Sequence, residues 1–573
     1  MRQKVTAPSG AAPVKGWSRM LASRARRLAA CCVLVAACAL AQGCAPTPRV
    51  VAPAGRAAID RSVLEGPPGF TVHRYIENLT APTAMTFDDR GNLLIAEGGL
   101  DGRAPAIYGF RPDGTRYTVY HDPQLPLSIA SPRNKLYGPI GGMIYHGGKL
   151  YVSHRDEKRL GVITAFGSDG SRKTVIAGMP AQGDYGLTDL AVGADGRLYF
   201  GIGTATNSGI VGLDNWAVGW PRQFSKVHDL PFGKIRLRGV RMDSRNPQAG
   251  LFGPGEKAVT GPFQPFDVAN KSWVYPPQNG KFNGAIYSVA PDGGDLRAEA
   301  WGIRLPRGLA FNATGLTLYF TNNGMELRGS RPVRDDPDVL CRLVRGTWYG
   351  WPDYSADFND ITLPRYQPPL ELLFPTGYDA LPLLLDQSAS GIEGGGLRVP
   401  SRETLLKGTF PSQSGAAKLV VVPRTGPFER YQGSALVALS GDRAPFATSN
   451  QKLVGQVGHK VVRVTVDNQQ VEDFLRNTRG LLAHELRKPE RDQTLERPVD
   501  VKFGPNGSLY VLDMGWMEVR NGTERVHAGT GGVFIVVPVQ AAAPERPAGE
   551  TQGDSGADAG VVPPADTPRT SPQ

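Results

Sequence analysis

Carboxylates gather in one short segment of this sequence, where Asp335, Asp336 and Asp338 lie within four positions of one another. A hard cation such as Ca²⁺ needs several oxygen ligands, and proteins often supply them as carboxylates. The same residues equally suit a solvated acidic turn, so the segment alone leaves both interpretations open. Upstream of it, Arg304 carries the planar guanidinium whose paired donors suit a carboxylate ligand.

The cysteines and histidines narrow the remaining site chemistry. Of five cysteines, four lie before residue 45, and only Cys341 remains in the body of the chain. There is no CxxCH motif for covalent haem and no pair of cysteines spaced for zinc. His146 and His154 fall in strand-like sequence and could reach a central pocket, although a lone histidine on a strand is more often structural.

A repeated pattern predicts the architecture, because internal repeats decide the fold. Each copy has an apolar strand, a turn of the Asp-Gly or Asn-Gly type, and a second strand, as expected of a β-hairpin. Copies occupy residues 85–95, 143–152, 190–200, 309–320 and 501–511, with a degenerate copy near 436–439. Between these copies lie further hairpin-like segments at 106–114, 163–170 and 286–293. Two hairpins make a four-stranded blade, so the sequence predicts an all-β, six-bladed β-propeller.

Two stretches between the repeats, 201–308 and 321–434, are much longer than a hairpin connection requires. Long loops on a rigid scaffold commonly carry function, although they also serve as plain or oligomerising surface. We therefore expect any site to draw residues from these long insertions.

The first 44 residues predict a lipoprotein-type signal peptide. They contain seven basic residues and no acidic one, and the uncharged run from Leu28 to Ala41 is too short to span a bilayer comfortably. The segment ends at Gly43-Cys44, which resembles a lipobox, with Cys38 as a second candidate and an uncleaved anchor as the alternative. These features predict a lipid-anchored protein of the cell envelope, facing the periplasm or held on the outer membrane.

Composition divides the rest of the chain. Residues 45–65 form a tether rich in Pro and Ala, residues 66–540 the propeller, and residues 541–573 a tail predicted to be disordered. The net charge of +11 comes largely from the leader, and no run of basic residues with interleaved aromatics stands out in the body. Nucleic acid is therefore not an expected partner.

Four short motifs follow one another between residues 302 and 352. The segment GIRLPRGLAF at 302–311 precedes TNNG at 321–324, the acidic segment and YGWP at 349–352. This order resembles the glucose/sorbosone dehydrogenase family, and later segments at 459–464 and 497–515 resemble it too. The resemblance covers roughly residues 68–537. It implies a six-bladed propeller that uses pyrroloquinoline quinone and Ca²⁺.

The resemblance also implies roles for individual residues. Arg304 would be catalytic and would bind the cofactor, and a weaker local alignment adds Arg424 and Arg443 as cofactor-binding candidates. Gly324 and Asp336 match the calcium loop in order, with a longer spacing.

One departure from the family pattern concerns the general base. The family has a histidine before the third-blade strand, whereas this chain has Tyr185 at about that position. A tyrosine with an ordinary pKa near 10 is a poor base at neutral pH. Tyr185 and Asp189 are therefore our catalytic candidates. Asp184 is a further acid that could act as the general base.

Three functions remain open from the sequence. The first is a quinone-dependent sugar or alcohol dehydrogenase that passes electrons to an external acceptor. The second is a non-catalytic propeller that binds a glycan or protein partner in the envelope. The third is a calcium-dependent hydrolase or lactonase, since a six-bladed ring hosts several activities.

Overall fold

The computed structural model describes residues 47–50, 57–121, 135–250, 255–271, 276, 280–391, 397–398, 400–449, 456–520 and 522–539. All of these except Val539 fall in one compact unit. The predicted signal peptide at 1–44 and the predicted tail at 541–573 lie outside the described residues. Within the predicted tether, short strands at Arg49–Val50 and Leu64–Glu65 pair with the outer edges of two blades.

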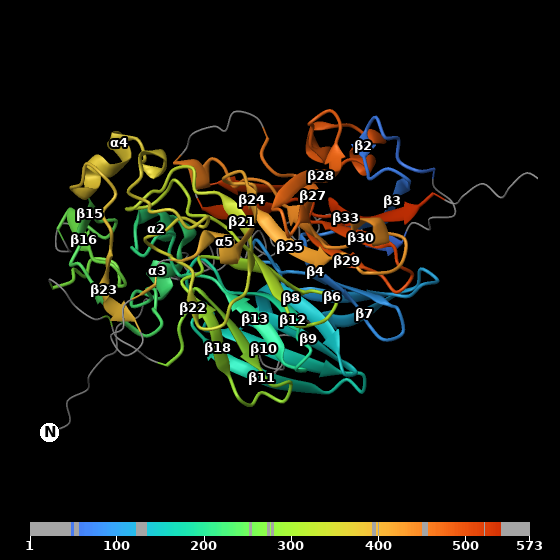
Figure 1. The fold of residues 1–573 in the computed structure, drawn as a ribbon, viewed down its shortest axis with the longest axis horizontal. Helices are drawn as coiled ribbons and strands as arrows, with labels where there is room; N and C mark the ends of the chain where they lie inside the picture. Colours follow the sequence, from blue (N-terminus) through green and yellow to red (C-terminus); the bar gives the residue numbers. More distant parts are fainter. Residues whose placement is uncertain are drawn as a thin grey trace, which may run out of the picture. The chain divides into compact units, whose positions relative to one another are not determined.

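Six sheets of four or five strands form the blades of a propeller, which confirms the predicted fold class (Figure 1). Blade 1 contains β4 (Pro82–Phe87), β5 (Leu93–Glu97), β6 (Ala106–Phe110) and β7 (Arg116–His121). Blade 2 contains β8 (Tyr137–His146), β9 (Lys149–Arg155), β10 (Gly161–Gly167) and β11 (Arg172–Met179). Blade 3 contains β12 (Leu187–Val192), β13 (Leu198–Ile202), β17 (Ala285–Val289), β18 (Arg297–Trp301) and β22 (Thr347–Trp348).

The other three blades complete the ring. Blade 4 contains β19 (Pro306–Phe311), β20 (Leu318–Asn322), β21 (Asp338–Arg342) and β24 (Leu406–Phe410). Blade 5 contains β25 (Ala416–Val421), β26 (Ser434–Leu439), β27 (Lys460–Thr465), β28 (Gln470–Asn477) and β2 (Leu64–Glu65). Blade 6 contains β29 (Pro498–Phe503), β30 (Leu509–Asp513), β33 (Gly531–Pro538), β3 (Phe70–Leu79) and β1 (Arg49–Val50).

Blade 6 joins the two ends of the propeller. Its strands β29, β30 and β33 come from the end of the unit, whereas β3 comes from its beginning and pairs antiparallel with β33. In Figure 1 the blue β3 accordingly lies beside the red β33. The ring is thus held shut by backbone hydrogen bonds between distant parts of the sequence.

The first strand of each blade faces the ring axis, and each contacts the first strands of both neighbouring blades. Glycines allow this close approach. A Cβ at Gly141 of β8 would lie 2.1 Å from the carbonyl oxygen of Leu187 in β12, and one at Gly308 of β19 would lie 2.5 Å from that of Ala417 in β25. Larger residues at these positions would push the inner strands apart.

The hairpin repeat predicted five inner strand pairs correctly, namely β4–β5, β8–β9, β12–β13, β19–β20 and β29–β30. In these pairs the turn glycine has positive φ, as at Gly196 (70°) and Gly507 (75°). The degenerate copy near 436–439 is β26, the second strand of blade 5, rather than its first. The inner strand is β25, which a longer connection at 422–433 separates from β26, so the turn signal is missing there.

Short elements fill the insertions between and within blades. Three additional strand pairs are β14 (Lys234–Leu237) with β23 (Leu385–Gly391), β15 (Met242–Arg245) with β16 (Lys257–Thr260), and β31 (Met517–Arg520) with β32 (Thr523–Val526). The helices are α2 (Leu213–Val218), α3 (Trp220–Gln223), α4 (Leu370–Leu373) and α5 (Arg402–Leu405). Short 3₁₀ turns are η3 (Pro364–Tyr366), η4 (Phe374–Thr376), η6 (Glu429–Tyr431), η7 (Phe446–Thr448), η8 (Ala483–Glu485) and η9 (Glu490–Gln493). Across the described residues, no helix has the length and apolar character needed to cross a membrane.

Candidate functional site

A cavity of about 880 Å³ opens on the ring axis, at the end where the inner strands begin. The start of every inner strand contributes to its lining: Thr83 of β4, Tyr137 to Gly141 of β8, Leu187 and Thr188 of β12, Arg307 of β19, Lys418 of β25 and Val499 of β29. A cavity of this size accommodates a small-molecule ligand. The six-bladed ring therefore places one central pocket where all blades meet.

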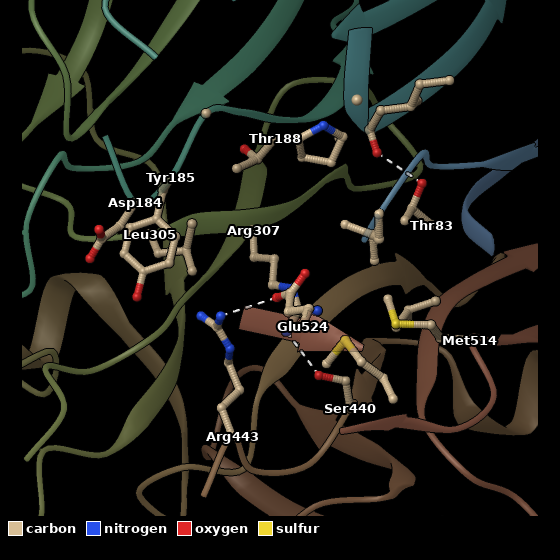
Figure 2. Close-up of a pocket in the computed structure, with 18 of the residues that line it drawn as sticks. Thr83, Asp184, Tyr185, Thr188, Leu305, Arg307, Ser440, Arg443, Met514 and Glu524 are labelled. Atoms are coloured by element: carbon tan, nitrogen blue, oxygen red, sulfur yellow. Dashed lines mark hydrogen bonds and ion pairs between the residues drawn. The ribbon is translucent and has the colours of Figure 1, made fainter. Parts of the chain in front are cut away.

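Six arginines line this cavity, and we call four of them, which come from four different blades, the arginine cluster. They are Arg155 at the end of β9, Arg307 in β19, Arg443 in the loop after β26, and Arg497 directly before β29. Figure 2 shows Arg307 and Arg443 with their side chains directed toward Glu524 in the cavity. The cluster gives its part of the wall a positive charge, although eight carboxylates, Glu524 among them, also line the cavity.

The arginine cluster has few anionic partners of its own. Arg443 is the one member of the cluster with a carboxylate ion pair among the described residues, and its partner is Glu524 at 3.0 Å. Arg307 donates instead to Ser440 Oγ (2.8 Å), Arg497 to the carbonyl of Asp442 (2.8 Å), and Arg155 to the carbonyl of Gly183 (3.3 Å). The Nε atoms of Arg155, Arg443 and Arg497 are buried without any hydrogen-bond partner. Unpaired buried donors of this kind call for a ligand.

The pKa values of three of these guanidinium groups are lowered, as the shortage of anionic partners leads one to expect. Burial lowers the pKa of Arg155 to about 9, with repulsion from the neighbouring Arg159 as the next cause. Burial lowers the pKa of Arg307 to about 10, with repulsion from Arg443 as the next cause. The pKa of Arg497 is also lowered by burial. An anion in the cavity would offset both desolvation and mutual repulsion.

Tyr185 lines the cavity directly before β12, and its hydroxyl oxygen meets two guanidinium groups. Arg304 donates to this oxygen at 2.6 Å and Arg328 at 3.3 Å. Burial raises the pKa of Tyr185 above its usual value even though both arginines oppose the shift. Tyr185 is therefore a neutral phenol at physiological pH, suited to donating a hydrogen bond to a ligand oxygen rather than to removing a proton.

Behind Tyr185 lies a buried network of charges that holds the phenol in place. Arg304, only 2% exposed, pairs with Glu326 at 3.1 Å and does not itself line the cavity. Arg328 pairs with Asp184 at 2.9 Å and also contacts Glu326 and Asp214. Burial would raise the pKa of Glu326, but Arg328 and Arg304 outweigh it and hold the value at about 2. The predicted catalytic Arg304 thus positions Tyr185 from behind.

The predicted calcium ligands lie close together, but their oxygens are already engaged. Arg304 donates to the carbonyl oxygen of Gly324 at 2.6 Å. The carboxylate of Asp336 accepts from the backbone amides of Met325 (2.6 Å) and Ala356 (2.8 Å), and burial raises its pKa to about 8. A carboxylate whose two oxygens both accept from backbone amides and a carbonyl that already binds a guanidinium do not fit Ca²⁺. No group of three or more His, Cys, Asp or Glu side chains placed for a metal occurs among the described residues.

The other predicted catalytic acid, Asp189, lies on β12, is 1% exposed and does not line the cavity. Its carboxylate is 3.6 Å from Nζ of Lys418, which also lies 3.7 Å from Asp500 of β29. Burial raises the pKa of Asp189, although Lys418 opposes the change. This arrangement links the three inner strands β12, β25 and β29.

The predicted cofactor-binding arginines separate in the structure. Arg443 belongs to the arginine cluster, whereas Arg424 is exposed in the connection that follows β25. Since Lys418 near the start of β25 lines the cavity, Arg424 lies beyond the opposite end of that strand. The structure therefore does not bring Arg424 together with Arg304 and Arg443.

His154 does not reach the cavity and has a structural role in β9. It is 4% exposed, with Nε2 at 2.8 Å from Thr164 Oγ1 and Nδ1 at 2.6 Å from the carbonyl oxygen of Arg155. Burial lowers its pKa to about 4. The histidine is therefore neutral in the folded protein over most of the pH range.

A test of this role is the pH dependence of folding. A lowered histidine pKa contributes stability above its unfolded value near 6.5, and that contribution is lost as pH falls toward 4. The shift corresponds to about 3 kcal/mol of unfolding free energy. His154→Gln should reduce the acid-induced loss by up to that amount in urea unfolding at pH 7 and pH 4.5. His146→Gln, in the β8–β9 turn region, is the control and should leave the loss unchanged.

Three members of the arginine cluster, together with Glu524 and Lys418, were not among the sequence-predicted site residues. A local signal existed for two of them, because Arg307 follows Pro306 and Arg497 precedes Pro498 at the start of an inner strand. Arg155 has no comparable signal. It joins the site only because the ring brings the end of β9 to the same face.

Comparison with known proteins finds distant structural similarity. No family model matches the chain, and no curated protein matches its sequence. A Carbohydrate-Active Enzymes Family AA12 structure from Trichoderma reesei aligns with 85% of this chain and all of its own, at 13% identity and a TM-score of 0.45. A putative oxidoreductase (glucose dehydrogenase) from Thermus thermophilus aligns over 82% of this chain and all of its own, at 17% and 0.42. The pyranose dehydrogenase PQQ domain of Coprinopsis cinerea aligns over 84% and 98%, at 14% and 0.45. Similarities this low assign no activity.

Proposed function

We propose that the protein binds a polycarboxylate quinone in the axial cavity and uses it to oxidise a sugar or another alcohol. The observation that carries this proposal is the arginine cluster, in which four buried or half-buried guanidinium groups share a single carboxylate ion pair among the described residues. Guanidinium groups bind carboxylates through paired hydrogen bonds. A tricarboxylate such as pyrroloquinoline quinone fits this donor set.

The chain's own residues would bind and orient the two reactants. The arginine cluster would hold the carboxylates, and the bound quinone would supply a two-electron acceptor. Tyr185 would donate its hydroxyl proton in a hydrogen bond to a ligand oxygen, held in position by Arg304 and Arg328. Electrons would leave to an external acceptor, and the predicted leader would place the protein in the cell envelope with a lipid anchor.

One observation favours the second candidate, a non-catalytic binding propeller. The neutral Tyr185 stands where the resemblance implies a base, and Asp184 beside it is tied to Arg328 at 2.9 Å and accepts from Trp220 at 2.7 Å. Neither group is free to take a proton from an alcohol. The same cationic cavity would then bind an anionic glycan. The calcium-dependent hydrolase gains no support from Gly324 and Asp336.

Titration with pyrroloquinoline quinone tests the proposal directly. We expect it to raise the melting temperature of the purified protein and to bind more tightly than menadione, an uncharged quinone. Addition of aldoses and alcohols should then bleach the bound quinone. Binding without bleaching would favour the non-catalytic candidate. An unchanged melting temperature at saturating cofactor, or an equal response to menadione, would contradict recognition of a polycarboxylate quinone.

A further inference from the structure

The hairpin β31–β32 carries a carboxylate into the cavity. This hairpin is inserted between β30 and β33 of blade 6, and Met517, Thr523 and Glu524 from it line the cavity wall. Glu524 lies in β32 opposite Val519 of β31, so a regular strand pair fixes its position. In Figure 2 the Glu524 side chain points toward Arg307 and Arg443.

Glu524 acts electrostatically on the whole arginine cluster. It contacts Arg443 directly at 3.0 Å, and it is the first favourable charge that raises the pKa of that guanidinium. Its charge also opposes the lowering of the pKa of Arg155, Arg307 and Arg497. Among the described carboxylates, Glu524 is the one that is a main influence on all four members of the cluster. Its side chain is 27% exposed, so a ligand can reach it.

We infer that Glu524 is the built-in counter-ion of the arginine cluster and limits how strongly the cluster binds ligands of high negative charge. An entering anion competes with Glu524 for Arg443 and is repelled by it elsewhere in the cavity. A ligand with several carboxylates can also engage Arg155, Arg307 and Arg497, which have no carboxylate ion pair among the described residues, but Glu524 repels it in proportion to its charge. Glu524 is thereby a specificity-determining residue that reduces the preference of the cluster for polycarboxylates over monocarboxylates.

This inference deepens the proposed function because it concerns the same cavity, yet it does not depend on a quinone. Citrate and acetate therefore serve as probes, with their binding to the full-length protein measured calorimetrically at low salt and pH 7. Glu524→Gln keeps the size and hydrogen-bonding capacity of the side chain and removes its charge. Glu518→Gln is the matched control on the same hairpin, because Glu518 pairs with Arg520 (2.7 Å) and His527 (3.2 Å) and does not line the cavity.

We expect Glu524→Gln to bind citrate about tenfold more tightly than the wild type and to gain less affinity for acetate, so that it discriminates more strongly in favour of citrate. Glu518→Gln should match the wild type. Unchanged or weaker citrate binding by Glu524→Gln would overturn the inference, as would an equal gain in Glu518→Gln. Glu524→Asp retains the charge on a shorter stem, and its citrate affinity should lie between those of the wild type and Glu524→Gln.

The two proposals fail in different ways. If citrate binding responds to Glu524→Gln as expected but pyrroloquinoline quinone binds to neither protein, the counter-ion role stands and the quinone function falls. If the quinone binds and is bleached by substrate while citrate affinity is the same in both proteins, the quinone function stands and the counter-ion role falls.

Discussion

Replacing Arg307 with methionine is expected to weaken binding of pyrroloquinoline quinone and of citrate about a hundredfold, because truncating one side of a buried charge pair costs several kcal/mol. Arg307 lies in β19 with its guanidinium in the cavity, and it has no carboxylate partner among the described residues. Its charge is thus available to a ligand. Methionine retains much of the apolar stem and removes only the donors.

The same substitution should leave the free energy of unfolding of the ligand-free protein unchanged or raise it. Burial and repulsion from Arg443 lower the pKa of Arg307 to about 10, which means that the folded state disfavours this charge. Loss of the hydrogen bonds to Ser440 and to the carbonyl of Gly415 offsets part of the gain. A variant that binds less but melts no earlier identifies a ligand-binding cation rather than a structural one.

Arg424→Met is the matched control for this experiment. Arg424 was also predicted from the sequence to bind the cofactor, but it is exposed beyond the far end of β25. The Arg424→Met variant should bind pyrroloquinoline quinone and citrate with affinities within twofold of the wild type. An equal loss in both variants, or no loss in Arg307→Met, would contradict the location that we propose for the ligand. Isothermal calorimetry at two salt concentrations measures each affinity and its electrostatic share.

Lys418→Met should lower the free energy of unfolding by about 3–5 kcal/mol, the cost of leaving a buried charge uncompensated. Lys418 is 3% exposed, and its Nζ donates to the carbonyl of Thr83 at 2.9 Å besides facing Asp189 and Asp500. Lys502, 3.4 Å from Asp500, still neutralises that acid in the variant. Asp189 loses its nearest cation, and its Oδ1 has no hydrogen-bond partner.

The pH dependence separates this cause from a simple packing defect. A carboxyl whose folded pKa lies above its unfolded value destabilises the fold at high pH, and this penalty disappears as pH falls and the group binds a proton. The pKa of Asp189 is already raised by burial and should rise further without Lys418. The difference between wild type and Lys418→Met should therefore narrow from pH 7 to pH 4 in urea unfolding. A difference that stays constant with pH would contradict the electrostatic explanation.

The propeller was predictable because its signal is local and repeated. An apolar strand, a glycine turn and a second strand recur within a dozen residues, as in 190–200, and each copy is a hairpin in the structure. In blade 5 the degenerate copy marked β26 but not the inner strand β25, because a long connection without that turn separates the two strands. No local pattern in the sequence indicates that β3 pairs with β33.

The site was predicted only in part because its residues come from separate blades. Tyr185 and Arg304 are 119 positions apart and meet through a hydrogen bond, and both were identified from the motif order. The motif could not show that Arg304 lies behind Tyr185 rather than in the cavity. Arg155, Arg307 and Arg497 depend on the curvature of the ring, which brings the ends of distant strands to one axis.

The seam in blade 6 has a consequence for how the protein is made. Arg74 of β3 donates to the carbonyl of Gly531 in β33, 457 positions away, so the sheet lacks its closing partner until synthesis has passed that point. Until then, β3 has unpaired backbone hydrogen-bonding groups along one edge. Such exposed edges can pair with strands of other chains. We expect closure to come late in folding, since it joins the most distant contacts. The newly made chain should therefore be prone to aggregation until β33 pairs with β3.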